Sequence, residues 1–386
     1  MNRLRICVVL VAAALAGWAL RSHSTHAAEA DHQDWPVTGG NSANNHYSSL
    51  AQINRDNVKD LQVAWTFDAK DSFNGSEIEC NPIVVDGVLY ATTARVNVIA
   101  LDGATGKLRW RFDPNTNHKI GAYIGGKGRN RGVTYWSDGK NKRIFAGANQ
   151  YLYSLDTETG RPVEAFADGG KIDLRDGLGR KPLNWIQLTS PVVAYKDLVI
   201  VGSSMGEAMP ASPGDIRAFD ALTGKLRWTF HTIPHPGEFG YDTWPKDAWK
   251  YSGSANNWAG MSLDRERGLV FIPLGSAVSD FYGANRVGDD LFANSLLVLK
   301  ADSGERVWHF QTVHHDIWDR DLPTAPTLVT IKHDGKDVDA VAQPTKTGFV
   351  YVFDRQTGAP LFPVEEQKAP ASDLEGEVTL QLSRCR

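Results

Sequence analysis

The stretch VIALDGATGKLRWRF, residues 98–112, reads as two short strands joined by a tight turn. Apolar residues alternate up to Asp102, Ala-Thr-Gly follows as a turn, and Leu-Arg-Trp-Arg-Phe alternates again. A period of two places successive side chains on opposite faces of a sheet. The stretch therefore predicts a β-hairpin.

Four more stretches follow the same pattern: LYSLDTETGRPVEAF (152–166), IRAFDALTGKLRWTF (216–230), LLVLKADSGERVWHF (296–310) and VYVFDRQTGAPLFPV (350–364). The glycine in each turn suits a backbone position with φ above zero, which a side chain would strain. The Asp that ends the first strand is expected to hydrogen-bond forward into the turn, and Lys300 takes its place in the fourth copy. The hairpin is therefore predicted five times.

The spacing of these copies, roughly 55 to 80 residues, leaves room for four strands and a loop in each period. One small sheet cannot bury both of its faces, so the copies must stack on one another. Radial stacking gives a β-propeller and linear stacking gives a solenoid, and the long spacing favours the propeller. The predicted fold class is all-β, a propeller with about five to six blades encoded in this chain.

The first thirty residues differ from the rest. Arg3 and Arg5 precede an apolar run over residues 6–20, and Ala28-Glu29-Ala30 fits a cleavage site, so residues 1–30 are expected to be a signal peptide. An uncleaved anchor is the alternative, but the run is shorter than the ~20 residues that a spanning helix needs. Residues 31–386 would then form one periplasmic domain without a transmembrane segment.

Charge and cysteine content exclude other classes of function. The formal net charge is −4 and no basic patch occurs, so nucleic acid is not an expected partner. Cys7, Cys80 and Cys385 provide no disulfide framework, and the absence of a Cys-x-x-Cys-His motif excludes covalent haem.

Polar segments between the hairpins are the candidates for chemistry, because loops on one face of a propeller converge on its axis. HHDIWDRD (314–321) places Asp316, Asp319 and Asp321 around a tryptophan. Three close carboxylates repel one another unless a cation or a proton intervenes, so a metal site or a general base competes with a solvated acidic turn.

Three further segments contain one notable side chain each: Glu207 in GSSMGEAMP (202–210), Trp258 in SGSANNWAGMSLD (252–264) and Lys346 in QPTKTGFVYVFD (343–354). Taken singly, such residues are more often part of a surface turn, a packed core and an ordinary loop than of a site. Their functional interpretation depends on their lying together.

The hairpins and these segments together resemble the dehydrogenases that depend on pyrroloquinoline quinone (PQQ), from about Asp34 to about Thr379. The similarity is greatest to the glucose-dehydrogenase-like branch, with alcohol-dehydrogenase-like features in GYDTWPKDAWKYSGSANNW (240–258). The resemblance implies an eight-bladed propeller of quinoprotein type, in which PQQ lies flat on the axis beside a calcium ion and an aspartate acts as base.

Residue by residue, the resemblance implies Asp319 as the catalytic base and Lys346 as the residue that hydrogen-bonds the quinone oxygens. The cofactor-binding residues that it implies are Glu79, Arg131, Thr189, Ser204, Trp258 and Lys346, with Trp258 stacked on the PQQ plane. The metal ligands that it implies are Glu207, Ser276, Asp319 and Asp321. The metal would be calcium, another divalent ion or a lanthanide.

Several positions differ from the family pattern or are ambiguous in it. Leu274-Gly275-Ser276 stands where many members have Thr-Gly-Asn, so a serine oxygen replaces an asparagine ligand. Gly125-Gly126 stands where the alcohol branch has adjacent cysteines, and the histidine of the glucose branch falls on Lys127 or its neighbourhood. Asp321 is compatible both with relatives that use lanthanides and with the glucose branch.

The expected function is periplasmic oxidation of a glucose-like sugar or an alcohol by hydride transfer to PQQ, with electrons passed to a quinone or cytochrome c. A non-catalytic propeller scaffold of the same repeat type and an inactive fragment of the enzyme are the alternatives. Five hairpins are fewer than eight blades need, and the final residues, 380–386, leave the family pattern. Residues 31–386 are therefore expected to form an incomplete propeller, whose open sheet edges favour aggregation.

Overall fold

The computed structural model describes residues 34–115, 129–180 and 185–385. These residues divide into two compact units, with Ser48–Asp60 in the smaller unit and Asp34–Tyr47 and Leu61–Arg386 in the larger. The smaller unit contains the short 3₁₀ helix η1 (Val58–Asp60). The predicted signal peptide, Gly125, Gly126 and Lys127 lie outside the described residues.

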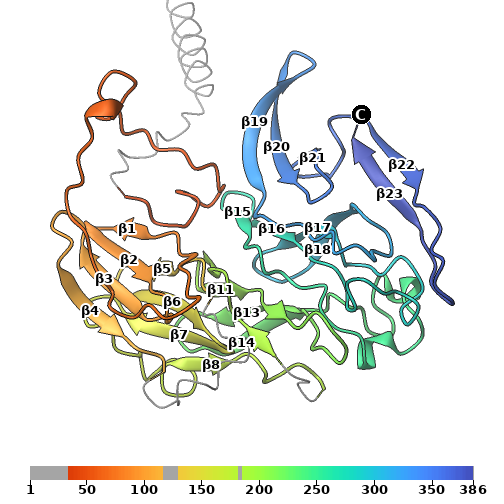
Figure 1. Cartoon of the computed structure of the whole chain (residues 1–386), viewed down its shortest axis with the longest axis horizontal. Helices are drawn as coiled ribbons and strands as arrows, with labels where there is room; N and C mark the ends of the chain where they lie inside the picture. Colours follow the sequence, from red (N-terminus) through yellow and green to blue (C-terminus); the bar gives the residue numbers. More distant parts are fainter. Residues whose placement is uncertain (1–33, 116–128, 181–184, 386) are drawn as a thin grey trace, which may run out of the picture. The chain divides into compact units, whose positions relative to one another are not determined.

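Four antiparallel sheets of four strands follow one another along the larger unit (Figure 1). In chain order, their strands are β1 (Ile83–Val85), β2 (Val88–Thr92), β3 (Val98–Asp102) and β4 (Leu108–Phe112); β5 (Thr134–Ser137), β6 (Lys142–Ala148), β7 (Tyr151–Asp156) and β8 (Lys171–Asp173); β10 (Val193–Tyr195), β11 (Leu198–Val201), β13 (Ile216–Asp220) and β14 (Leu226–Phe230); and β15 (Ser262–Asp264), β16 (Leu269–Pro273), β17 (Ser295–Lys300) and β18 (Arg306–Gln311). The described helices are η1, η2 (Tyr241–Thr243) and η3 (Ala248–Lys250), all short 3₁₀ helices, which agrees with the predicted all-β class.

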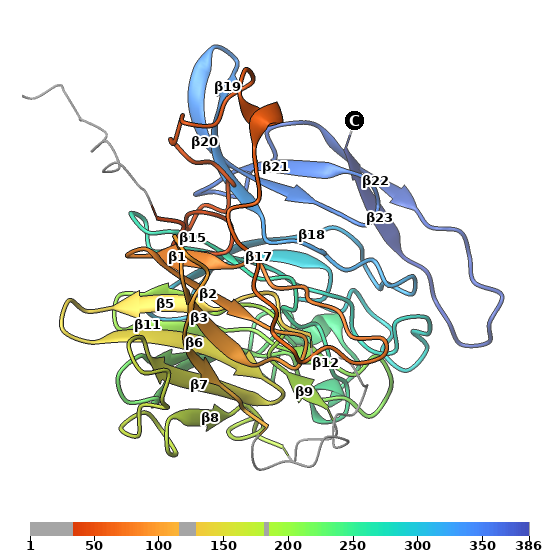
Figure 2. The ribbon, with the colours of Figure 1, turned by 60° about the vertical axis from the view of Figure 1, so that its left-hand side comes forward.

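A fifth sheet has three strands, β19 (Thr327–His333), β20 (Lys336–Pro344) and β21 (Val350–Asp354). Two smaller ribbons accompany the sheets: β9 (Ile186–Gln187) with β12 (Ser204–Met205), and β22 (Val364–Lys368) with β23 (Gln381–Cys385). Figure 2 shows β22 and β23 as a separate two-stranded element near the end of the chain. None of the described helices is long and apolar enough to cross a membrane.

The predicted hairpins are correct in three copies and wrong in part in two. Residues 161–166 do not form the expected second strand, and β8 completes that sheet instead. In the fifth copy, β21 pairs with β20 but meets the residues after the turn only through an isolated bridge from Phe353 to Pro360, and β22 pairs with β23. Pro162 and Pro360 lack the N–H that a ladder needs, so each interrupts the strand at its start.

The predicted turn chemistry is confirmed. Asp102 Oδ1 accepts the backbone N–H of Thr105 at 3.0 Å and its hydroxyl at 2.8 Å. Asp156, Asp220 and Asp354 make the same pair of contacts with Thr159, Thr223 and Thr357. The following glycines have positive φ, for example 68° at Gly106.

Tryptophans of the hairpins connect the first sheet to the second, the third to the fourth and the fourth to the fifth. The indole N–H of Trp110 in β4 donates to the carbonyl of Thr157 at 2.9 Å, and a Cβ on Gly160 would overlap its ring. Trp228 and Trp308 lie in the same way on the turns that contain Gly304 and Gly358. The glycines of these turns thus serve two purposes: they adopt a left-handed backbone conformation, and their lack of a Cβ lets an indole ring pack directly on the turn.

The second copy contains no tryptophan in its second half, and Arg143 of β6, in the same sheet, makes a different contact. The guanidinium of Arg143 donates to the carbonyls of Ala221 and Leu222 in the next turn, at 2.6 and 2.9 Å. The same guanidinium lies 5.8 Å from the ring centroid of Phe166. The connection between the second and third sheets is therefore polar at this point.

Residues 61–67, LQVAWTF, repeat the second half of the hairpin, and the sequence analysis overlooked them. The indole N–H of Trp65 donates to Gly103 O at 3.1 Å, and its ring lies against Gly106. The segment thus occupies the position of an outer strand, but no strand of the described chain pairs with it. Val63 is 79% exposed as a result.

The hydrophobic core lies between neighbouring sheets. One cluster joins β1–β3 to β6 and β7, and the next joins the second sheet to the third. Two more clusters join the third sheet to the fourth and the fourth to the fifth. Neighbouring sheets therefore bury apolar side chains against one another, as the stacking argument predicts.

We expect Gly160→Ala to lower the free energy of unfolding by about 2–4 kcal/mol, because the methyl group adds a clash with Trp110 to the strain of a positive φ. Gly139→Ala is the matched control, since Gly139 has φ 90° and nothing within 4 Å of the added Cβ. We expect it to cost about 1 kcal/mol. Urea unfolding followed by tryptophan fluorescence measures both free energies of unfolding. Equal losses of stability in the two variants would show that the contact of Trp110 with Gly160 contributes nothing.

Candidate functional site

A polar cavity of about 240 Å³ lies where loops from the sheets of the larger unit meet. Every predicted site residue except Glu79 lines it: Arg131, Thr189, Ser204, Glu207, Trp258, Ser276, Asp319, Asp321 and Lys346. These residues come from positions as far apart as 131 and 346 in the chain. The fold therefore brings the predicted set together.

Ends of strands place these side chains. Thr189 follows β9 and Ser204 begins β12, and the two strands pair through Gln187 and Ser204. Ser276 follows β16, and Asp319 and Asp321 follow β18. Lys346 lies in the turn between β20 and β21, where Thr345 N–H donates to Phe349 O at 3.0 Å.

Trp258 lies in a segment that asparagines hold from both sides. Asn256 Nδ2 donates to Ser203 O at 2.7 Å, and Asn257 Nδ2 donates to Pro273 O at 2.7 Å. The Trp258 carbonyl accepts the hydroxyl of Ser190. The segment that carries Trp258 is consequently fixed to Ser190, Ser203 and Pro273.

Lys346 joins two of the three carboxylates of residues 314–321, the acidic loop. Its Nζ lies 3.0 Å from Asp319 Oδ1 and 3.2 Å from Asp321 Oδ2. Asp321 also accepts the indole N–H of Trp258 at 3.0 Å and the backbone N–H of Ser276 at 2.6 Å. One contiguous network thus contains a predicted base, a cation and a flat aromatic ring.

Electrostatics make this network chemically unusual. Burial raises the pKa of Asp319, and the neighbouring Asp321 adds to this against the opposing effect of Lys346. Burial works against the charged form of Lys346, but the two carboxylates outweigh it and raise the pKa of the lysine. Asp319 is therefore a stronger base than an exposed aspartate, beside a lysine that stays protonated.

Asp280 is a site residue that the sequence analysis missed. It lines the same cavity, and its backbone carbonyl accepts the N–H of Asp319 at 3.3 Å. Burial, and then repulsion from Asp321, Asp319 and Glu207, raises its pKa to about 7. Its position four residues after Ser276 was the available signal, because the same loop carries both.

Asp316, the third carboxylate of the acidic loop, has a structural role. It is buried, and its oxygens accept the N–H groups of Trp318 and Arg320 at 3.0 and 2.6 Å. Ser276 Oγ and Asn294 Nδ2 complete its partners at 2.5 and 2.9 Å. Asp316 thus shapes the loop that presents Asp319.

Arg131 lines the cavity and pairs with Glu79. Arg131 Nη2 lies 2.9 Å from Glu79 Oε2, and its guanidinium lies 5.2 Å from the ring centroid of Trp258. Burial lowers the pKa of Arg131, although Glu79 opposes the shift. Glu79 does not line the cavity and supports Arg131 from behind.

The cavity suits a flat, anionic ligand such as PQQ. Arg129, Arg131 and Lys346 bring positive charge, and Trp258 offers a ring face. Thr189 Oγ1 and Trp185 Nε1 are buried without a hydrogen-bond partner among the described residues. Unpaired buried donors are costly, so a polar ligand that accepts from them would stabilise the site.

The same cavity offers oxygen donors to a metal ion. Glu207, Asp280, Asp319 and Asp321 all line it, and carboxylate oxygens suit hard cations such as Ca²⁺. Within the described residues, no group of three His, Cys, Asp or Glu side chains already lies in an arrangement that could hold a metal. The donor chemistry fits a hard cation, and the roles of Glu207 and Ser276 as ligands stay predictions.

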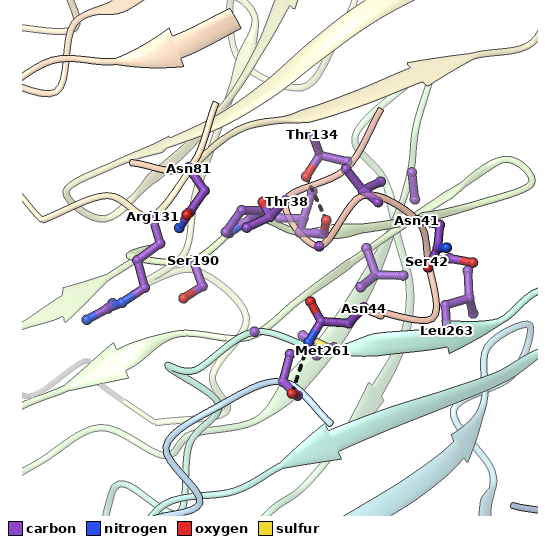
Figure 3. Close-up of a pocket in the computed structure, with 18 of the residues that line it drawn as sticks. Thr38, Asn41, Ser42, Asn44, Asn81, Arg131, Thr134, Ser190, Met261 and Leu263 are labelled. Carbon is purple, nitrogen blue, oxygen red and sulfur yellow. Dashed lines mark hydrogen bonds between the residues drawn. The ribbon is translucent and has the colours of Figure 1, made fainter. Parts of the chain in front are cut away.

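A second cavity, of about 250 Å³, shares Arg131 with the first. Figure 3 shows its wall of residues from the segment before the first sheet, including Thr38, Asn41 and Asn44, with Asn44 bonded to a neighbouring carbonyl. The Arg131 side chain extends away from Asn41 in this view. None of the described residues that line this cavity is acidic or a lysine, so it offers no carboxylate base.

Comparison with known proteins agrees with this geometry. The family model for the glucose/ethanol/alcohol dehydrogenase β-propeller domain matches residues 35–382. The quinoprotein glucose dehydrogenase of Escherichia coli K12 is 34% identical over 89% of this chain and 45% of its own length. The glycerol dehydrogenase large subunit of Gluconobacter oxydans 621H is 33% identical over 88% of this chain and 47% of its own.

Solved structures agree as well. Quinohemoprotein alcohol dehydrogenase from Comamonas testosteroni superposes with a TM-score of 0.75 at 27% identity, over 91% of this chain and 52% of that one. The corresponding enzyme from Pseudomonas putida HK5 gives a TM-score of 0.72 at 30% identity, over 90% and 50%. The chain thus spans about half the length of these relatives. With its sheets, turns and cavity, the chain belongs to the PQQ family of glucose, ethanol and alcohol dehydrogenase β-propeller domains.

Proposed function

We propose that this chain is the cofactor-binding part of a PQQ-dependent dehydrogenase that oxidises the hydroxyl group of a sugar or an alcohol. The observation that carries the proposal is the contact of Lys346 with Asp319 and Asp321 beside Trp258, in a cavity with unpaired donors. The names of the relatives, which include glucose, glycerol and alcohol dehydrogenases, support the substrate class.

Bound PQQ would supply a quinone that accepts hydride from the substrate carbon. Arg131, Ser204 and the unpaired hydroxyl of Thr189 would hold its anionic edge, and the Trp258 ring would shield one face. Lys346 would donate a charge-assisted hydrogen bond to a quinone oxygen. These residues would bind and orient the cofactor and exclude water from it.

Asp319 would take the proton of the substrate hydroxyl at a carboxylate oxygen. Its raised pKa matches this task, because a base with a pKa nearer to neutrality drives proton transfer better than an ordinary aspartate. Asp321, held by Ser276 N–H and the Trp258 indole, keeps Lys346 beside the base.

Calcium is the proposed metal, with Glu207, Ser276, Asp319 and Asp321 as its ligands and Asp280 as an additional candidate. One structural neighbour is a europium-containing methanol dehydrogenase, which makes a lanthanide the second choice. A cation here would relieve the repulsion among the carboxylates that, together with burial, raises the pKa of Asp280.

The proposed location is the periplasm, on the basis of the expected signal peptide. The proposed electron acceptor is a quinone or cytochrome c, and relatives named as quinone-dependent alcohol and quinate/shikimate dehydrogenases support the quinone.

Titration with PQQ in the presence of Ca²⁺ tests the proposal. We expect quenching of tryptophan fluorescence through Trp258 and reduction of an artificial dye with glucose, glycerol or ethanol. A chain that shows neither quenching nor turnover would contradict the proposal and favour a scaffold, while quenching without turnover would favour an inactive fragment.

Asp319→Asn should lower kcat by at least 100-fold, the usual scale for loss of a general base, with PQQ affinity within about threefold of wild type. The isosteric amide keeps the size of the side chain and removes its basicity. Asp337→Asn, at an exposed carboxylate paired with Lys332 on the β19–β20 hairpin, is the control and should leave both values unchanged. Equal turnover in the two variants would exclude Asp319 as the base.

Trp258→Ala should weaken PQQ binding by about 10-fold or more, because it removes the stacking face and the N–H that anchors Asp321. Trp258→Phe keeps an aromatic face and loses only the N–H, so its affinity should lie between those of wild type and Trp258→Ala. Isothermal titration of the metal-loaded protein measures this order. An affinity of Trp258→Ala equal to that of wild type would place the cofactor elsewhere.

Asp280→Asn should change the pH dependence of stability in the EDTA-treated protein. A carboxyl group with a folded pKa of about 7, above its ordinary 3.8, favours folding below pH ~4 and loses that contribution as pH rises through ~7. We therefore expect Asp280→Asn to be more stable than wild type at pH 8, by on the order of 2 kcal/mol, and similar to it at pH 4. Urea unfolding of both proteins between pH 4 and pH 8 measures this difference. If the stability of the two proteins changes with pH in parallel, the pKa of Asp280 is not raised by burial and repulsion.

A further inference from the structure

Arg286 is a fully buried cation that does not line the proposed site. Its side chain is 0% exposed and pairs with Asp290, 1% exposed, with 2.5 Å between Nη1 and Oδ2. Its other terminal nitrogen, Nη2, donates to two backbone carbonyls, those of Ser279 at 3.1 Å and of Asp316. One guanidinium thus joins two loops at three points.

Both of these loops present carboxylates to the cavity. Ser279 precedes Asp280, and Asp316 lies three residues before Asp319. Asp319 N–H donates to Asp280 O at 3.3 Å, so the loops also touch beside the base. Arg286 therefore holds the two walls of the cavity that carry Asp280, Asp319 and Asp321.

The contact reaches Asp319 through Asp316. Arg286 holds the carbonyl of Asp316, while the carboxylate of Asp316 accepts the N–H groups of Trp318 and Arg320 at 3.0 and 2.6 Å. These two amides flank Asp319. Asp319 has a φ of 54°, in the left-handed region that costs a non-glycine residue about 1 kcal/mol or more, so the loop needs support from its surroundings.

His315 completes the anchor. Its side chain is 0% exposed, and Nδ1 lies 3.2 Å from Asp290 Oδ2 and 3.0 Å from Gly288 O. Asp290 thus contacts both Arg286 and His315, the residue before Asp316. A planar fork suits this arrangement, because a lysine ammonium reaches as a single point and cannot span a carboxylate and two carbonyls in the same way.

We infer that Arg286 is a positioning residue for the reaction: it holds the Asp319 loop against the Asp280 loop and so fixes the direction of the Asp319 carboxylate. The inference rests on the proposed function in that Asp319 is the base. Misplacement of a reacting group by about 1 Å can cost on the order of 100-fold in rate.

Arg286→Lys tests this, with Arg217→Lys as the matched control. Arg217 is 4% exposed and also donates to two carbonyls, those of Asp176 and Leu174, both at 2.7 Å, but neither of these residues lines the cavity. Hydrogen–deuterium exchange of the cofactor-free protein should show the amides of Trp318 and Arg320 exchanging at least 10-fold faster in Arg286→Lys only. In the loaded enzyme, kcat should fall at least 10-fold with KM within about threefold, again in Arg286→Lys only.

Equal exchange of the 315–321 segment in the two variants, or a kcat of Arg286→Lys within twofold of wild type, would overturn the inference. If Arg286→Lys does not fold, Asp290→Asn removes the carboxylate anchor while leaving the guanidinium, and the same two readouts and limits apply. If the wild-type chain neither binds PQQ nor turns over, the proposed function is refuted. The contact of Arg286 with the loop is tested separately, because hydrogen–deuterium exchange is measured on the cofactor-free protein.

Discussion

An indole ring seated on a left-handed glycine is the contact on which the rest of this structure depends. Trp110 on Gly160, Trp228 on Gly304 and Trp308 on Gly358 set the spacing and direction of neighbouring sheets. Each indole N–H donates a hydrogen bond to a backbone carbonyl. This bond fixes the orientation of the ring, which apolar packing alone would not do. With the sheets held in this way, the loops at one end of the strands meet at a common cavity.

The cavity is partly buried and is lined by side chains of both charges. Carboxylates at positions 207, 280, 319 and 321 face guanidinium and ammonium groups at 129, 131 and 346. Burial and the neighbouring carboxylates raise the pKa of Asp280, while Lys346 partly offsets the same effects at Asp319. Such shifted groups beside unpaired donors are typical of sites that bind an ionic ligand and transfer protons.

Local chemistry explains what could be read from the residues. The hairpins, their Asp and Gly turns and their mutual stacking follow from a period of two and from turn residues with one preferred conformation. Pro162 and Pro360 show the limit, because the alternating pattern continues across them while the hydrogen-bond ladder does not. Residues 61–67 show another limit, since a second strand without its first gives no hairpin pattern to detect.

The sequence established the all-β class, the repeat and the chemical types of the site residues, because turn geometry and side-chain chemistry are properties of short segments. Only the tertiary structure decided that Asp280 joins the site, that Asp316 shapes a loop instead of lining the cavity, and that Glu79 stands behind Arg131. Arg286 likewise became visible only through its contacts with Ser279 and Asp316. These outcomes depend on the direction of side chains from distant segments, which is set by the packing of whole sheets and is encoded in no single stretch.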